Sequence, residues 1–303
     1  MNVVDVQNVV KKFGEVTASN NITFNVGQDR IFGLIGPNGA GKTTMIRMIT
    51  NVLIPDEGSI SIFGEKISYA LQNIIGYLPE ERGLYKKLKV IEQLAYFGQL
   101  KGMTRRNAIA EGRMWLAKLD AADWANKKIE ELSKGMQQKV QFISTILHKP
   151  KLLILDEPFS GFDPINTELL KSIILDLKKQ GTSIILSTHI MEQAEQMCDD
   201  ICLINNGQII LRGSIRDIKG DFSKDTVILE FDGSDDFLNE LSGLKIINKT
   251  TNRLEFRFNP NELDAKTILT TIMKYCNVYK FEIKEPSLHE IFIDVVSTEE
   301  DKK

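Results

Sequence analysis

Nine residues near the start of the chain have the types and spacing of a phosphate-binding loop. Residues 36–44, with the sequence GPNGAGKTT, fit the pattern G-x-x-x-x-G-K-[ST] at every fixed position. The glycines allow the backbone to curl, so that several N–H groups point at one anion. Lys42 is expected to reach the β- and γ-phosphates of a nucleotide, and Thr43 to offer its hydroxyl to Mg²⁺. The residues that we expect to bind the nucleotide are Gly36, Asn38, Gly39, Gly41, Lys42, Thr43 and Thr44.

The segments on either side of this loop have the patterns of a strand and a helix. Residues 30–35 are a short, mostly apolar run typical of a buried strand, and residues 43–49 carry apolar side chains at helical positions. The loop therefore leads into a helix N-terminus, whose partial positive charge attracts anions. The alternative is a glycine-rich turn that binds nothing, and the strand–loop–helix context argues against it.

Two carboxylates follow a second buried strand. Residues 152–155 (LLIL) are apolar, and Asp156 and Glu157 come directly after them. A carboxylate at the end of such a strand is placed to hold Mg²⁺, which we assign to Asp156. Glu157 lies one residue further on and is our candidate general base. The alternative for paired acids at this place is a helix N-cap or a solvated turn.

The composition sets limits on the compartment and the class of partner. The 303 residues have a formal net charge of −3 and a pI of about 5.8, so no general affinity for nucleic acid is expected. With only three cysteines a reducing compartment is favoured, and Cys198 and Cys202 are interpreted as packing residues. We expect no signal peptide, and no apolar run approaches the roughly 20 residues that span a bilayer.

The order of strands and helices predicts an α/β core and a second, smaller domain. Period-2 strands are expected near the N-terminus, and helical periodicity covers about residues 88–149. The composition changes at about residues 213–221, so we place one domain at 1–218 and another at 221–298. The second has the order β-α-β-β-α-β of a ferredoxin-like α+β fold, with its second helix expected at 262–276 and its last strand at 279–284. Residues 221–303 hold 11 Lys and Arg against 17 Asp and Glu, which argues against nucleic-acid binding there.

Taken together, these stretches resemble the ATP-binding subunit of ABC transporters, over residues 2 to about 215. Residues 36–44 are similar to the family's Walker A motif, and residues 152–157 to its Walker B motif. Residues 132–136 (LSKGM) resemble the signature motif, residues 160–163 (SGFD) the D-loop, and His189 the switch histidine. The resemblance implies a P-loop NTPase cassette of the ABC type, with a mixed sheet core, an antiparallel β subdomain and a helical subdomain.

The resemblance also implies how the residues act on ATP. Two cassettes would enclose two ATP molecules head to tail, and Ser133, Gly135 and Asp163 of one copy would close over the nucleotide on the other. His189 would contact the γ-phosphate and hold Glu157 and the attacking water. Phe13 would stack on adenine; the alternative is an exposed loop aromatic. For Ser133 the simpler interpretation is that it caps its own helix, and both roles are compatible.

Two motifs depart from the common pattern. The signature motif has Lys134 and Met136 where glycine and glutamine are usual, but Ser133 and Gly135 remain. At the Q-loop position the chain has Glu80 instead of glutamine. A carboxylate still ligates Mg²⁺, so Glu80 joins Thr43 and Asp156 as an expected metal ligand. Its negative charge beside the phosphates is expected to alter turnover.

These variants, together with the C-terminal domain, resemble the exporter ATPases that work with a separate permease. This subgroup implies an ATPase on the cytoplasmic side, peripheral on the inner face of the cell membrane through the permease, and acting as a homodimer or with a second cassette. The first alternative is a soluble ABC ATPase that acts on ribosomes or nucleic acid. Its translation members carry two cassettes per chain, and its chromosome members carry a long coiled coil that these 303 residues lack. The second is a regulatory module whose C-terminal domain binds a small ligand or a protein.

Overall fold

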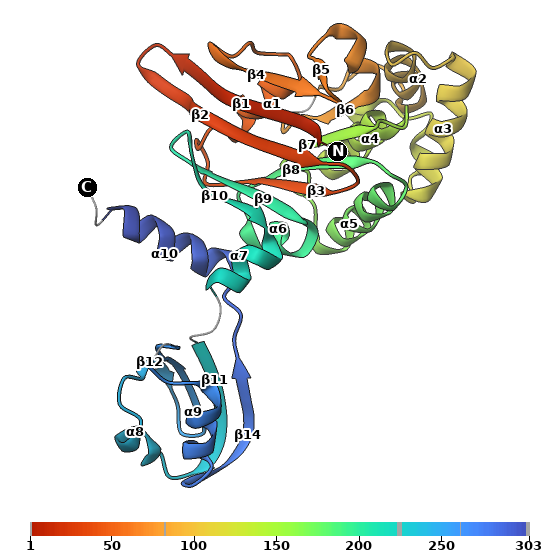
Figure 1. The fold of residues 1–303 in the computed structure, drawn as a ribbon. Coiled ribbons are helices and arrows are strands. Elements are labelled where there is room, and N and C mark those ends of the chain that lie inside the picture. The colour runs from red at the N-terminus through yellow and green to blue at the C-terminus, as the bar shows by residue number, and fades with distance from the viewer. Residues whose placement is uncertain (1, 82, 223–225, 261, 301–303) are drawn as a thin grey trace. The chain divides into compact units, whose positions relative to one another are not determined.

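The computed structural model describes residues 2–81, 83–222, 226–260 and 262–300 (Figure 1). The chain divides into two compact units, Met1–Ile215 and Arg216–Lys303. The division falls within the stretch 213–221, at which the composition changes. Within the described ranges, none of the helices combines the length and the apolarity that crossing a membrane requires.

A six-stranded sheet forms the centre of the first unit, in the described part of the chain. Five neighbouring strands are parallel, and only the edge pair of β10 and β9 is antiparallel. Parallel strands are covered on both faces, which explains why the central strands are buried throughout and mostly apolar. In spatial order the strands are β10 (Gln208–Ser214), β9 (Asp200–Asn205), β3 (Ile31–Ile35), β8 (Ser183–Thr188), β7 (Leu152–Asp156) and β6 (Ile75–Leu78).

A separate antiparallel sheet is built mainly from the N-terminal strands (Figure 1). The pairing of β1 with β2 has register shifts at several points, which are bulges or irregularities. Asn8 and Asn21 have left-handed φ values of 50° and 54°, and each interrupts the period-2 alternation without ending its strand. In spatial order the strands are β2 (Val16–Gly27), β1 (Asn2–Phe13), β4 (Glu57–Ile62) and β5 (Glu65–Lys66).

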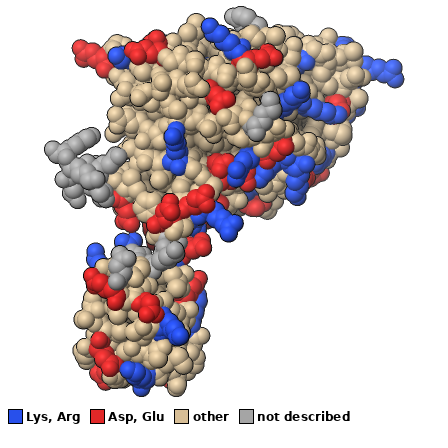
Figure 2. All heavy atoms as spheres, in the orientation of Figure 1, with Lys and Arg blue, Asp and Glu red and all other residues tan. Residues whose placement is uncertain are grey.

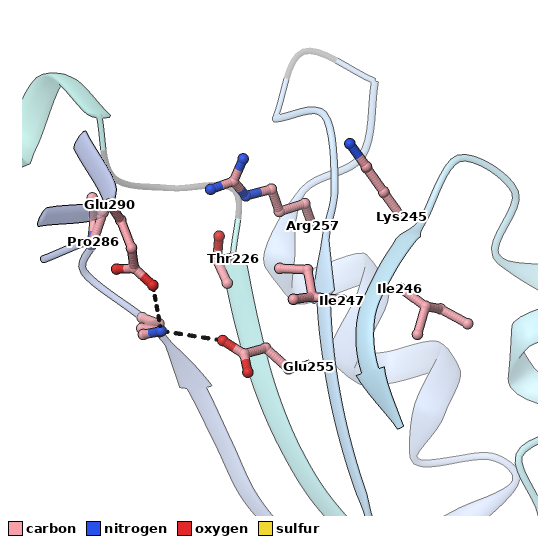
Figure 3. Close-up of a pocket in the computed structure, with 9 residues that line it drawn as sticks. Thr226, Lys245, Ile246, Ile247, Glu255, Arg257, Pro286 and Glu290 are labelled. Atoms are coloured by element: carbon pink, nitrogen blue, oxygen red, sulfur yellow. Dashed lines mark hydrogen bonds and ion pairs between the residues drawn. The ribbon is translucent and has the colours of Figure 1, made fainter. Parts of the chain in front are cut away.

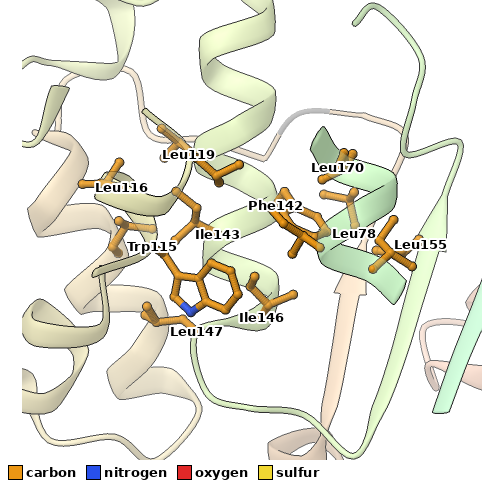
Figure 4. Packing of buried hydrophobic residues seen from close by; sticks show 14 of the residues in the cluster. Leu78, Trp115, Leu116, Leu119, Phe142, Ile143, Ile146, Leu147, Leu155 and Leu170 are labelled. Atoms are coloured by element: carbon orange, nitrogen blue, oxygen red, sulfur yellow. The ribbon is translucent and has the colours of Figure 1, made fainter. Parts of the chain in front are cut away.

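Helices flank the central sheet and form the expected helical subdomain. Figure 4 shows Trp115 of α3 and Phe142 of α4 among leucine and isoleucine side chains, in a cluster that includes Leu155 of β7. Cys202 lies in the cluster on the other face of the sheet, so its interpretation as a packing residue is confirmed. The helices are α1 (Lys42–Ile49), α2 (Val90–Leu100), α3 (Arg105–Lys118), α4 (Lys134–Ile146), α5 (Pro164–Lys179) and α6 (Met191–Met197).

The second unit has the predicted ferredoxin-like order, and its sheet runs β12-β13-β11-β14 with antiparallel neighbours. The expected helix at 262–276 is shorter than predicted, because Asp264 caps it at its start and the chain turns after Ile272. Cys276 already pairs with Gly233, so the last strand begins there and not at residue 279. The elements are β11 (Thr226–Gly233), α8 (Phe237–Glu240), β12 (Lys245–Lys249), β13 (Arg253–Arg257), α9 (Ala265–Ile272), β14 (Cys276–Ile283) and α10 (Leu288–Glu300), and α7 (Ile215–Phe222) begins at the division.

Candidate active site

The glycine-rich loop connects β3 to α1, as the sequence predicts. Its glycines at 36, 39 and 41 have φ values of 148°, 81° and 106°, a region that side chains disfavour. No side chain caps the start of α1, where Gly41 is the N-cap. The first amides of this helix are therefore available to an anion.

Lys42 is buried beneath the loop. Its ammonium donates to the carbonyl oxygens of Gly36 at 2.7 Å and Pro37 at 3.0 Å. Burial lowers the pKa of Lys42, and the carboxylates of Glu157, Asp156 and Glu80 act in the opposite direction, in that order. The lysine therefore lies in the field of the three acids that the sequence singles out.

A pocket of about 490 Å³ opens beside the loop, within the size range of small-molecule sites. One wall comes from the start of β2, and another from the turn between β9 and β10. Glu80 and Glu157 border the pocket together with Lys42. The lining residues are Val16, Thr17, Ala18, Asn38, Gly39, Gly41, Lys42, Thr43, Thr44, Glu80, Glu157, Asn206 and Gly207.

Asp156 ends β7 and is only 1% exposed. Neither of its carboxylate oxygens has a hydrogen-bond partner among the described residues. Its register neighbour on β8 is Ser187, whose hydroxyl is also buried and unpartnered. A buried carboxylate without a partner is costly, so this position fits a bound cation. Hydroxyl and carboxylate oxygens from Thr43, Asp156 and Glu80 are the hard ligands that Mg²⁺ prefers.

Glu157 turns the chain away from the sheet with a left-handed φ of 50°. Its amide donates to the carbonyl of Ser187 at 3.0 Å, which fixes the residue against the end of β8. Its Oε1 lies 2.8 Å from Nδ1 of His189, the second residue after Ser187. Two residues 32 positions apart are thus brought together as a carboxylate–imidazole pair at the edge of the pocket.

Comparison with known proteins identifies this arrangement. A family model described as "ABC transporter" matches residues 19–160, and one described as "ATP-binding protein DrrA1-3-like, C-terminal domain" matches residues 213–296. The ABC transporter ATP-binding protein YhaQ of Bacillus subtilis is 45% identical over 291 residues, which cover 96% of this chain and 97% of YhaQ. The chain belongs to the ATP-binding proteins of ABC transporters.

Two further relatives of the cassette are informative. The Nod factor export ATP-binding protein I of a Rhizobium species is 35% identical over 216 residues, or 70% of each chain. A solved ATP-binding subunit of an ABC transporter is 30% identical with a TM-score of 0.68, and the match covers 73% of this chain and 93% of that one. The predicted cassette fold is therefore confirmed.

Other residues that the resemblance assigns to the cassette lie at its helix and strand ends. Ser133 caps α4 by accepting from the amide of Met136 at 3.3 Å, and Asp163 caps α5 by accepting from that of Asn166 at 2.9 Å. Phe13 ends β1 and is 48% exposed. None of these three is among the described residues that line the pocket. Their contacts with nucleotide stay predictions.

The sequence interpretation missed two parts of the cassette's site. Asn206 and Gly207 form the β9–β10 turn with φ values of 47° and 72°, and the Gly207 amide donates to the Ala40 carbonyl at 3.1 Å. An Asn-Gly pair between two apolar runs is a strong hairpin signal and could have revealed this turn. Ser187 could not have been found in this way, since only the pairing of β7 with β8 brings it next to Asp156.

Proposed function

We propose that this cassette binds and hydrolyses ATP with Mg²⁺, and that a pair of cassettes drives export of a substrate through a separate membrane permease. The observation that carries the proposal is the Glu157–His189 pair beside the phosphate-binding loop. The Rhizobium relative is named as an export ATP-binding protein, which supports export as the direction of transport.

The charged residues at the pocket and its edge have the following roles in this proposal. Glu157 accepts the proton of the attacking water, and His189 holds the carboxylate in place. Lys42 exchanges its bonds to loop carbonyls for bonds to phosphate oxygens. Thr43, Asp156 and Glu80 would hold Mg²⁺, and the ion would supply positive charge that stabilises the phosphates.

Gly135 supports the pairing of two cassettes. It lies in the first turn of α4 with no left-handed φ, and an added methyl group would meet no atom of the described residues within 4 Å. Within the described part of a single chain, nothing therefore requires glycine at this position, where alanine favours a helix. We attribute the glycine to the close approach of a nucleotide bound by a second cassette.

A Gly135→Ala cassette tests this pairing. We expect an unchanged or slightly raised unfolding midpoint, but a rate of ATP hydrolysis lower by about 10- to 100-fold, the loss of one charge-assisted contact. Phosphate release and denaturant unfolding measure the two effects. Gly220→Ala is the matched control, because Gly220 is also helical with open space around it. Wild-type hydrolysis by Gly135→Ala would contradict the pairing.

An aromatic cluster of Tyr85, Tyr96 and Phe97 offers a surface for the permease. Ring centroids of Tyr85 and Tyr96 lie 5.7 Å apart, and the two side chains are 52% and 42% exposed. Aromatic residues are enriched in protein interfaces. The amide of Tyr85 donates to Oε1 of Gln93 in α2 at 2.8 Å, and Tyr85 follows Glu80 by five positions in the sequence. A partner seated here is well placed to act on the nucleotide pocket.

Membrane isolation tests the permease proposal. We expect tagged Glu157→Gln protein with ATP to sediment with membranes and with one integral-membrane protein. Adding Tyr96→Ala is expected to reduce this recovery about tenfold, as for an interface hot spot. Tyr279→Ala, an exposed tyrosine of the second unit, is the control. Recovery with ribosomes alone would favour the soluble-ATPase alternative.

Figure 2 shows basic and acidic residues interspersed on one face of the molecule. This distribution does not support the alternative of a soluble ATPase that acts on ribosomes or nucleic acid.

A further inference from the structure

The second unit presents an open sheet edge at β12. All five of its residues are exposed, with Ile246 at 46% and Ile247 at 51%. Among the described residues, β12 pairs only with β13. An exposed edge strand with apolar side chains is a template for pairing with another chain.

Two cations face each other across the start of this edge. In the register of β12 and β13, Lys245 lies opposite Arg257. Like charges at directly opposed positions destabilise a sheet. Arg257 reaches Asp294 at 3.5 Å, but Lys245 has no ion-pair partner in the described part of the chain. The position therefore favours an additional anion.

A pocket of about 310 Å³ adjoins the same two strands (Figure 3). Its inner side is fixed by Lys284, which pairs with Glu255 at 3.2 Å and Glu290 at 2.9 Å. Lys284 and the two glutamates therefore already compensate one another's charge. Burial raises the pKa of Glu290, but the hydrogen bonds from Ser287 and Lys284 outweigh this effect and lower the pKa to about 2. In Figure 3, the guanidinium of Arg257 extends toward the side of Thr226, apart from the ammonium of Lys245. Since Arg257 pairs with Asp294, Lys245 is the cation here that an added anion can pair with.

We propose that β12 binds an acidic, extended segment of a partner protein, which adds to the sheet as a further strand. A carboxylate of the segment pairs with Lys245, and its apolar side chains cover Ile246 and Ile247. Backbone hydrogen bonds to β12 provide affinity, and these side-chain contacts provide selectivity.

Other occupants use these features less completely. A small carboxylate would pair with Lys245 but leave the strand edge and the isoleucines exposed. A second copy of β12, paired antiparallel about Ile247, would place Lys245 opposite Lys249 and add another like-charge pair. The acidic strand is the occupant that uses the edge, the charges and the apolar side chains together.

The test uses the full chain and a fluorescein-labelled ten-residue peptide of alternating glutamate and valine. We expect saturable binding by fluorescence anisotropy, and slower amide hydrogen exchange at residues 245–249. The peptide with lysine in place of glutamate is expected not to bind. Lys245→Glu should weaken binding of the acidic peptide by about tenfold or more, the loss of one charge-assisted contact.

Lys280→Glu is the matched control, since it makes the same charge change on the other edge strand, β14. Lys245→Glu places opposite charges across from each other, so loss of folding is not expected to confuse the result. Equal effects of the two variants, or binding without protection of β12 amides, would overturn the proposal. A dimer seen in sedimentation without peptide, and altered only by Lys245→Glu, would also overturn the proposal. A second copy of the chain would then occupy the edge.

Discussion

A Glu157→Gln cassette is expected to bind ATP with near wild-type affinity while its hydrolysis rate falls by about 10²- to 10⁴-fold, the usual contribution of a general base. The amide cannot accept the proton of the attacking water. The substitution preserves the shape of the side chain, and an amide oxygen still pairs with a protonated His189 nitrogen. Phosphate release measures the rate, and titration with a fluorescent ATP analogue measures the affinity.

Glu168→Gln is the control for this substitution. Glu168 is an exposed carboxylate on α5 that pairs with Lys171, so its loss is expected to leave both quantities unchanged. A Glu157→Gln protein that hydrolyses ATP at the wild-type rate would remove Glu157 as the base. Loss of ATP binding in the same protein would instead show that the carboxylate holds the nucleotide site together.

The parts of the site that depend on neighbouring residues were predictable from the sequence. The phosphate-binding loop needs three glycines and a lysine at short range, and the fold places them between β3 and α1 as expected. Asp156 was predictable for the same reason, because an apolar strand that ends in an acid is visible in five residues. The order of elements in the second unit followed from period-2 and helical patterns alone.

The parts that depend on distant pairing were not predictable in this way. Asp156 and Ser187 are neighbours only because of the register of β7 and β8. Asn206 and Gly207 line the nucleotide pocket only because their turn packs against Ala40. The early end of α9 also has a non-local cause, since pairing of Cys276 with β11 draws the chain into the sheet. The pairing of His189 with Glu157 was expected from the family resemblance only.

A Gly36→Ala cassette is expected to lose both stability and nucleotide binding. Gly36 has a φ of 148°, and an added methyl carbon would lie 2.0 Å from the carbonyl oxygen of Ile204 in β9. This oxygen belongs to the backbone of a buried strand, so relief requires β9 or the loop to move. We expect a loss of about 3 kcal/mol or more in the free energy of unfolding, from overpacking and backbone strain together.

Gly39→Ala separates these two causes. Gly39 also has a positive φ, of 81°, but no atom lies within 4 Å of an added methyl group. Its cost is therefore the left-handed backbone alone, about 1 kcal/mol. Urea unfolding of the two variants gives the difference, and titration with nucleotide shows whether the loop still closes around phosphate. Equal stabilities would mean that the loop does not rest against β9. A larger loss of nucleotide affinity in Gly36→Ala than in Gly39→Ala would show that the position of the loop against β9, and not only its flexibility, determines how the phosphates are held.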